Sequence, residues 1–183
     1  MIRFLSSSFL LTSFLLFSCG KKEQKDNLVV QSLQQTGHLV TVEYSLSKMV
    51  KATDNRTWYK LGDRRLLIAV EAVVKAGVNL QHIAPENVTI QDSSIHLSLP
   101  SPTVFSVSLP PDKIRVLYEY VSFFRSRFTA AEREALLRQA ESQIRALTDS
   151  LGILTTARVN AETFLRNLLQ QGGYKNITIK FAQ

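Results

Sequence analysis

The sequence has 183 residues, of which 45% are hydrophobic and 20% charged, and its formal net charge is +7 at pH 7. This length suits one domain with a sizeable core. The one cysteine excludes an internal disulfide. The basic residues are scattered rather than massed, which argues against a nucleic-acid partner. Such charge is typical of a soluble surface, and attraction to an anionic membrane is the alternative.

The first 18 residues have the three parts of an export signal. Arg3 gives a positive start, residues 4–17 carry no charge, and Ser18 is the small residue that a peptidase needs before the cut. The apolar run is shorter than the roughly 20 residues that a membrane-spanning helix needs. Residues 1–18 are therefore predicted to be a signal peptide that is removed.

The signal ends in Leu16-Phe17-Ser18-Cys19, which has the form of a lipobox. An ordinary secretory signal does not need a cysteine directly after the cut. The segment resembles bacterial lipoprotein signals, and this resemblance implies a diacylglyceryl thioether on Cys19 and, in many species, an acyl chain on its amino group. Two or more chains give stable anchoring where one is marginal.

Cys19 is therefore the expected lipid-attachment residue and the membrane the expected partner. Residues 19–27 would form a lipidated, charged tether that keeps the domain close to the bilayer. The expected location is the cell envelope. In a Gram-negative cell, Gly20 favours the outer membrane, because Asp at that position would favour inner-membrane retention.

The first elements of the domain follow from Gly37 and from alternating side chains. Residues 28–36 are predicted to form a short helix that ends at Gly37. Residues 39–50 alternate apolar and polar, which indicates a half-buried strand. Residues 66–74 are apolar on both faces, which predicts a central strand covered at least partly on both sides, and Gly77 is expected to end it. Glu71 interrupts one face and must reach solvent or a cationic partner.

Further along the chain, the pattern predicts short strands and then helices. A hairpin is expected around residues 91–94, and two more strands at 104–109 and 114–120. Thr129 and Glu132 match a capping box that opens a helix over 130–150, which is followed by a second helix over 156–171. The helix faces expected to be buried contain Leu137, Ala140, Ile144, Leu147 and Leu151, then Ala157, Ala161, Phe164, Leu165 and Leu168.

A last alternating segment, residues 177–181, predicts a returning strand. Strands, then helices, then one strand is an α+β order. We expect residues 28–183 to form a single globular domain, with a mainly antiparallel sheet and the C-terminal helices packed on one face.

Four segments carry a resemblance to a family. They are Leu39 to Tyr44, residues 67–80 ending in Val-Lys-Ala-Gly-Val-Asn-Leu, the helix 136–146, and Gly173 to Ile179. Together they resemble the bacterial family called domain of unknown function 4230, over about residues 28–182. Asn79 stands where that family is expected to have Asp. The resemblance implies a fold but no catalytic residue.

No reactive constellation is recognisable in the sequence. His38, His82 and His96 lack metal-ligand spacing, and we interpret them as surface or core residues. No Gly-x-Ser-x-Gly turn and no phosphate-binding glycine loop occurs. Asp63-Arg64-Arg65 is interpreted as a solvated turn with a local ion pair, and anion binding by the arginines is the alternative.

The densest aromatic stretch also allows two interpretations. It contains Tyr118, Tyr120, Phe123, Phe124 and Phe128, with Arg125 and Arg127 among them. We interpret these side chains as core beneath the helices. The alternative is an exposed surface that faces a partner or a membrane.

The sequence thus predicts a lipid-anchored envelope protein whose domain binds or assembles and does not catalyse. An envelope protein is a further expected partner. The alternatives are an envelope hydrolase with a site assembled from distant residues, and a small-ligand carrier with an apolar cavity between sheet and helices. No catalytic, cofactor-binding or metal-binding residue is assigned.

Overall fold

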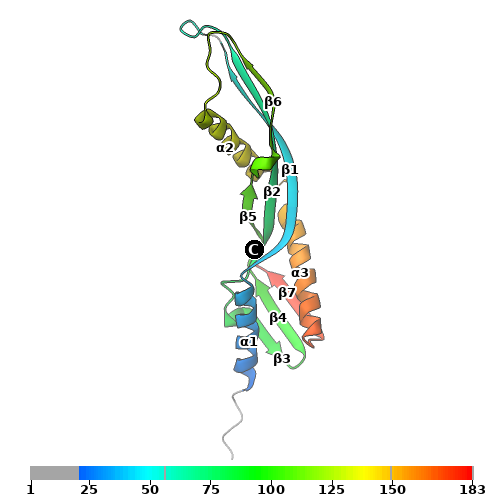
Figure 1. The fold of residues 1–183 in the computed structure, drawn as a ribbon. Coiled ribbons are helices and arrows are strands. Elements are labelled where there is room, and N and C mark those ends of the chain that lie inside the picture. The colour runs from blue at the N-terminus through cyan, green and yellow to red at the C-terminus, as the bar shows by residue number, and fades with distance from the viewer. Residues whose placement is uncertain (1–20, 56, 149, 183) are drawn as a thin grey trace, which may run out of the picture.

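The computed structural model describes residues 21–55, 57–148 and 150–182. They form an α+β structure, as predicted, and its shape is elongated (Figure 1). Three helices are present in this part of the chain: α1 (Lys21–Thr36), α2 (Ala130–Leu147) and α3 (Ile153–Gln171), with the short 3-10 turns η1 (Pro85–Asn87) and η2 (Pro111–Lys113). The strands are β1 (His38–Asp54), β2 (Arg64–Asn79), β3 (Val88–Gln91), β4 (Ser94–Leu99), β5 (Thr103–Ser108), β6 (Ile114–Val121) and β7 (Asn176–Phe181).

A long hairpin of β1 and β2 forms the axis of the molecule (Figure 1). The two strands are antiparallel, from the pair His38–Asn79 at one end to the pair Asp54–Arg64 at the other. The second edge of β2 is shared, because β5 pairs with its C-terminal half and β6 with its N-terminal half. The predicted central strand is therefore confirmed, and it pairs with three neighbours.

A second sheet lies at the end of the molecule that carries α1 (Figure 1). The predicted hairpin β3–β4 turns at Asp92, which has a φ of 54°. The last strand, β7, lies parallel to β4. The chain therefore returns to this small sheet and not to the long hairpin.

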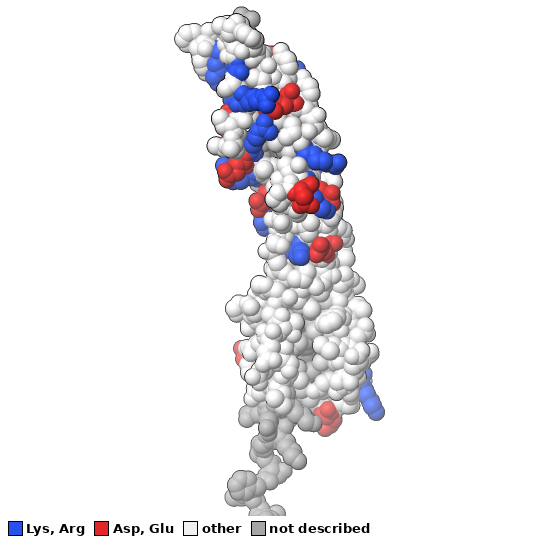
Figure 2. Space-filling view, in the orientation of Figure 1, with Lys and Arg blue, Asp and Glu red and all other residues white. Residues whose placement is uncertain are grey.

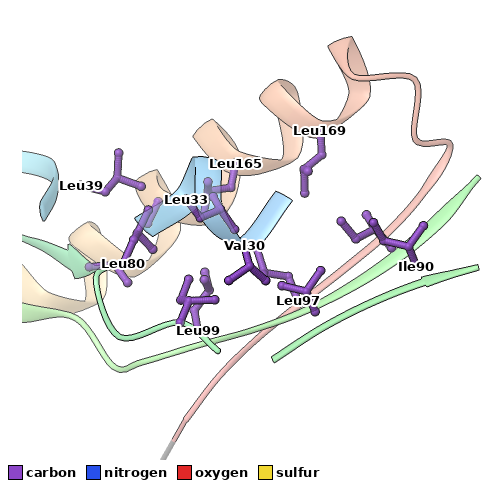
Figure 3. Packing of buried hydrophobic residues seen from close by; sticks show 14 residues of the cluster. Val30, Leu33, Leu39, Leu80, Ile90, Leu97, Leu99, Leu165 and Leu169 are labelled. Atoms are coloured by element: carbon purple, nitrogen blue, oxygen red, sulfur yellow. The ribbon is translucent and has the colours of Figure 1, made fainter. Parts of the chain in front are cut away.

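The buried side chains form two clusters. In the upper cluster, α2 and the first half of α3 cover the face of β2 that carries Ile68 and Val70. In the lower cluster, α1 and the second half of α3 pack on the small sheet, as Leu33, Leu97 and Leu165 show (Figure 3). The hairpin and α3 contribute to both clusters and so join them.

Gly77 lies where the two clusters meet, next to a bulge in β1. A Cβ atom at Gly77 would lie 1.9 Å from the carbonyl oxygen of Leu39, so the strands approach too closely for any side chain. The expectation that Gly77 ends the strand is wrong, because β2 continues to Asn79. The glycine is there because of close backbone approach.

Other expectations need correction at the level of side chains. Helix α1 begins at Lys21 and not at residue 28. In α2 the buried face contains Leu136, while Leu147 is 41% exposed; Leu151, after the helix, is 50% exposed. In α3, Phe164 is 50% exposed and so does not belong to the core with Val70. Periodicity alone locates the buried face of a helix only to within about one position, since neighbouring rows of side chains point in slightly different directions.

The second face of β2 is partly covered, as predicted. Leu67, Ala69 and Val73 are only half-buried, whereas the side chains that alternate with them are buried. Glu71 lies on this face and accepts a hydrogen bond of 2.5 Å from Lys113, whose side chain is 36% exposed. The carboxylate therefore has both a cationic partner and access to water.

Val70 provides a test of the central strand. Its side chain is 2% exposed in the upper cluster, so Val70→Asp would bury a carboxylate with no partner. We expect a loss of several kcal/mol, comparable to the total stability of about 5–15 kcal/mol of a typical domain. Urea denaturation should find the variant largely unfolded.

Glu71→Gln is the matched control on the neighbouring position. Its ion pair is partly exposed, so the loss should stay within about 1 kcal/mol. A Val70→Asp protein as stable as the wild type would show that β2 is not the central buried strand.

Candidate functional site

Five large apolar side chains are exposed at the end of the molecule opposite α1 (Figure 1). They are Trp58 (94% exposed), Tyr59 (64%), Leu61 (59%), Phe123 (94%) and Phe124 (73%), and we call them the aromatic tip. The ring centroids of Trp58 and Tyr59 are 5.4 Å apart and those of Phe123 and Phe124 5.2 Å apart, both edge to face. Contiguous apolar exposure of this kind marks an interaction surface.

The first half of the tip is the turn between β1 and β2. Thr57 and Lys60 exchange two backbone hydrogen bonds of 3.1 Å, which leaves Trp58 and Tyr59 at the apex of a two-residue turn. Such turns favour Asn and Gly. Two aromatic residues at the apex break this local preference, and departures from local preference concentrate at functional sites.

The second half is the loop after β6, which is joined to the first by hydrogen bonds. The backbone N–H of Ser122 donates to the carbonyl of Asp63 (3.0 Å), and the N–H of Asp63 donates to Ser122 Oγ (2.9 Å). Gly62 permits this contact: its φ is +89°, and a Cβ atom there would lie 2.5 Å from Ser122 Cβ. The two loops therefore form one surface.

A charged network lies directly behind the tip, and we call it the charged base. Asp54 accepts hydrogen bonds from Arg64 Nε (3.0 Å) and from Arg125, and Lys60 Nζ lies 3.6 Å from its carboxylate. Arg64 also donates two hydrogen bonds to Glu132, at 2.5 and 3.1 Å. The side chains of Arg64 and Arg125 are only 12% and 11% exposed, so these pairs are largely shielded from solvent.

The charged base connects three parts of the chain. Asp54 and Arg64 close the hairpin, Arg125 comes from the second loop, and Glu132 belongs to the first turn of α2. Arg125 Nη1 also donates to the carbonyl of Gly62 at 3.2 Å. The tip is thereby fixed to the hairpin and to α2.

The cations lower the pKa values of both acids. Hydrogen bonds from Arg64 and then Arg125 hold the pKa of Asp54 below its usual value. For Glu132, the hydrogen bonds from Arg64 and from the backbone of Thr129 lower the pKa from 4.5 to about 2. The same Glu132 completes the predicted capping box, because it accepts from Thr129 N at 2.8 Å while Thr129 Oγ1 accepts from its N–H.

The lowered pKa of Glu132 predicts how stability depends on pH. The carboxylate contributes stability that is fully present above pH 4.5 and is lost as the pH falls from 4.5 toward 2. Glu132→Gln keeps a side chain that can serve in the capping box but removes the charge. We expect the variant to be less stable than the wild type at pH 7, and the difference to shrink as the pH falls below 4.5. Chemical denaturation across this range measures both.

Glu134→Gln is the control on the same helix. Glu134 pairs with Arg138 on the exposed surface, with side chains 68% and 61% exposed, so its loss should change stability by less than about 0.5 kcal/mol at any pH. A pH profile of Glu132→Gln parallel to that of the wild type would contradict the role of the charged base.

The structure does not bring the three histidines together. His38 begins β1 and stacks on Phe105 with centroids 4.5 Å apart, His82 lies exposed after β2, and His96 lies exposed on β4. Within residues 21–55, 57–148 and 150–182, no group of three or more His, Cys, Asp or Glu side chains could hold a metal ion.

Two further candidates from the sequence, the segment 63–65 and the aromatic stretch 118–128, lie at or near the tip, and their interpretation needs correction. Arg64 is not in a solvated turn, because it begins β2 and its guanidinium is occupied by two carboxylates. Only Arg65 fits the predicted local pair, 3.9 Å from Asp63. In the aromatic stretch 118–128, Phe128 belongs to the core, as predicted, with Arg64 over its ring at 4.5 Å. The prediction is wrong for Tyr118, Tyr120, Phe123 and Phe124, which are 45–94% exposed.

Sequence reasoning missed Asp54, Arg125 and the second role of Glu132. Asp54 and Arg125 are 71 positions apart, and Arg64 and Glu132 are 68 apart, so no local spacing could pair them. Trp58, Tyr59 and Leu61 carried a usable signal, because three large apolar residues in a stretch between two strands are hard to bury.

Two surface depressions bear on the enzymatic and carrier alternatives. One of about 150 Å³ beside β4 is lined by Glu86, His96 and Ser98, but no hydrogen bond joins these three described side chains. A nucleophile and its base need such contact. Another of about 430 Å³ lies between β1 and α3, and Phe164 at its wall is half exposed, so it opens to solvent.

The fold and the tip define an α+β domain with an exposed aromatic end on a charged base. Residues 31–179 match the sequence model of a protein family described as protein of unknown function (DUF4230). The chain belongs to this family. The expected family is thereby confirmed. No curated protein and no solved structure matches the chain.

The predicted anchor lies outside the part of the chain that the structure describes, since this part begins at Lys21. The signal peptide 1–18 and the lipid on Cys19 therefore stay predictions. None of the described helices has the length and apolar character that crossing a membrane requires.

Proposed function

We propose that this protein is a lipid-anchored protein of the cell envelope that works by binding, with the aromatic tip as its binding surface. The observation that carries the proposal is the exposure of Trp58 and Phe123, both 94%, on loops that the charged base holds in place. Large aromatic side chains dominate the energetics of binding surfaces because they bury much apolar area with few rotatable bonds.

The arrangement of the molecule suits a tethered binding protein. The chain leaves the lipobox at Cys19 and enters α1 at Lys21, and α1 lies at the opposite end from the tip (Figure 1). The 17 residues of β1 span roughly 55 Å at about 3.3 Å per residue. A membrane holding the N-terminal end would therefore have the tip projecting away from it.

A binding role is favoured over the two alternatives. A hydrolase needs a nucleophile and a base in contact, and Ser98 and His96 share no hydrogen bond. A carrier needs an enclosed apolar cavity, whereas the depression beside Phe164 opens to solvent. The tip needs neither, because its side chains are already exposed.

Cys19→Ser tests the anchor. Loss of the thiol should abolish metabolic acyl labelling and move the protein out of the membrane fraction. The domain should stay folded, because Cys19 precedes α1 and both buried clusters begin at Val30 or later. Fractionation with acyl labelling, and thermal unfolding of the purified proteins, measure the two effects.

Gly20→Ala is the matched control one residue further on, and it should keep both the label and membrane retention. A wild-type protein that takes up no acyl label, and that stays in the membrane after Cys19→Ser, would exclude the lipid anchor.

A further inference from the structure

The charge around the aromatic tip indicates what kind of surface it meets. The described residues of the two segments that build the tip, 54–65 and 122–128, include five basic side chains and two acidic ones, Asp54 and Asp63, and Glu132 of the charged base is a third acid. All three acids are paired, Asp54 with Arg64 and Arg125, Asp63 with Arg65, and Glu132 with Arg64. The tip therefore presents a net positive charge to an approaching surface.

The positions of the charges suit a flat anionic surface. In Figure 2 the end that carries the tip is mostly uncharged, and blue side chains gather directly behind it, with a red group beside them. Lys60 follows the apex residues and is 5.6 Å from the ring of Tyr59, while Arg65 is half exposed at the start of β2. Rings at the front and cations just behind match the order of layers in a bilayer, with hydrocarbon below and headgroups above.

From this arrangement we infer that the aromatic tip inserts into the headgroup region of a lipid bilayer with anionic lipids. Trp and Tyr are enriched at membrane–water interfaces, where an apolar ring with a polar edge has both environments it needs. Phe123 and Phe124 supply the apolar area, and the basic residues are attracted to anionic headgroups within about a Debye length. Lipids rearrange around protruding rings, so no preformed complementary pocket is required.

Two other occupants fit less well. A second copy of the chain would set one positive tip against another, which opposes association. A protein partner would need pockets for two fully projecting rings, 94% exposed at Trp58 and Phe123, together with acidic side chains around them. A bilayer provides both properties without special shape.

The bilayer that the tip meets is a second one, facing the membrane that holds the N-terminal end. The tip and α1 lie at opposite ends of the elongated molecule (Figure 1), and the charged base ties the tip to the hairpin and to α2. This step rests on the proposed anchor, whereas the binding of the tip to lipid does not.

Trp58 makes the inference directly measurable, because it is the one tryptophan of the chain. The protein is purified from cells with its native processing and is anchored in vesicles of unbrominated lipid. These vesicles are then mixed with acceptor vesicles that contain brominated phosphatidylglycerol. Brominated chains quench tryptophan on contact. We expect the emission of Trp58 to shift to the blue and to be quenched, less so with brominated phosphatidylcholine, and less at high salt.

Phe123→Ser should weaken binding to the acceptor vesicles about tenfold, since it removes one buried aromatic ring. Phe164→Ser is the matched control, because Phe164 is half exposed on α3, away from the tip, and should leave quenching unchanged. Equal losses in the two variants, or an unquenched Trp58 in the wild type, would overturn the lipid-binding tip. Quenching only when the brominated lipid is in the anchoring vesicle would overturn the facing bilayer.

The outcomes separate this inference from the proposed anchor. If Cys19 carries lipid but Trp58 meets no brominated chain, the anchor stands and the lipid-binding tip fails. If Cys19 carries no lipid, the same protein is added to the acceptor vesicles without being anchored in others. Quenching of Trp58 there would keep the lipid-binding tip while the anchor fails.

Discussion

The ion pairs of Arg64 are the interaction on which the upper part of the molecule depends. One guanidinium closes the hairpin through Asp54, reaches the first turn of α2 through Glu132, and lies over the ring of Phe128. At this end β2 pairs with both β1 and β6, as far as Arg64 opposite Val121, and such a narrow sheet needs a packed face to be stable. Arg64 and its partners fasten the far end of the hairpin at several points, so that the exposed rings are held on a defined frame.

The distribution of packing explains why this fastening is needed. The apolar clusters occupy the lower and middle parts of the structure, and the last of the large buried side chains on β2 toward the tip is Leu66. Beyond it, none of the described residues of the hairpin is buried, and the large side chains Trp58, Tyr59 and Leu61 are exposed. Partly shielded ion pairs then take the place of hydrophobic packing, with hydrogen bonds between Asp63 and Ser122 joining the loops.

The elements of the fold could be predicted because their signals are local. Alternation identified β1 and β2, the Thr129–Glu132 capping box identified the start of α2, and Gly37 marked the end of α1. The pairing of strands was less accessible: nothing local shows that β7 joins β4 in parallel. Gly77 was misinterpreted because close approach to Leu39 depends on a bulge 37 positions earlier, at Val40.

The candidate site could not be derived from the sequence for two physical reasons. Hydrophobicity does not tell whether an aromatic residue is buried, so Phe123 and Phe124 had the same signal as the buried Phe128. The charged base joins residues far apart in the chain, and its geometry exists only after folding. A conflict between a turn and its residues, as at Trp58 and Tyr59, is the kind of local signal that can reveal such a surface.

We propose that the aromatic tip is the surface by which this protein meets its ligand, and that this ligand is lipid. A photo-reactive amino acid at position 123, introduced in cells, tests it most directly, with the same residue at the exposed position 159 of α3 as control. We expect phospholipid adducts at 123 and none at 159. A single protein adduct at 123, or equal labelling at both positions, would contradict it.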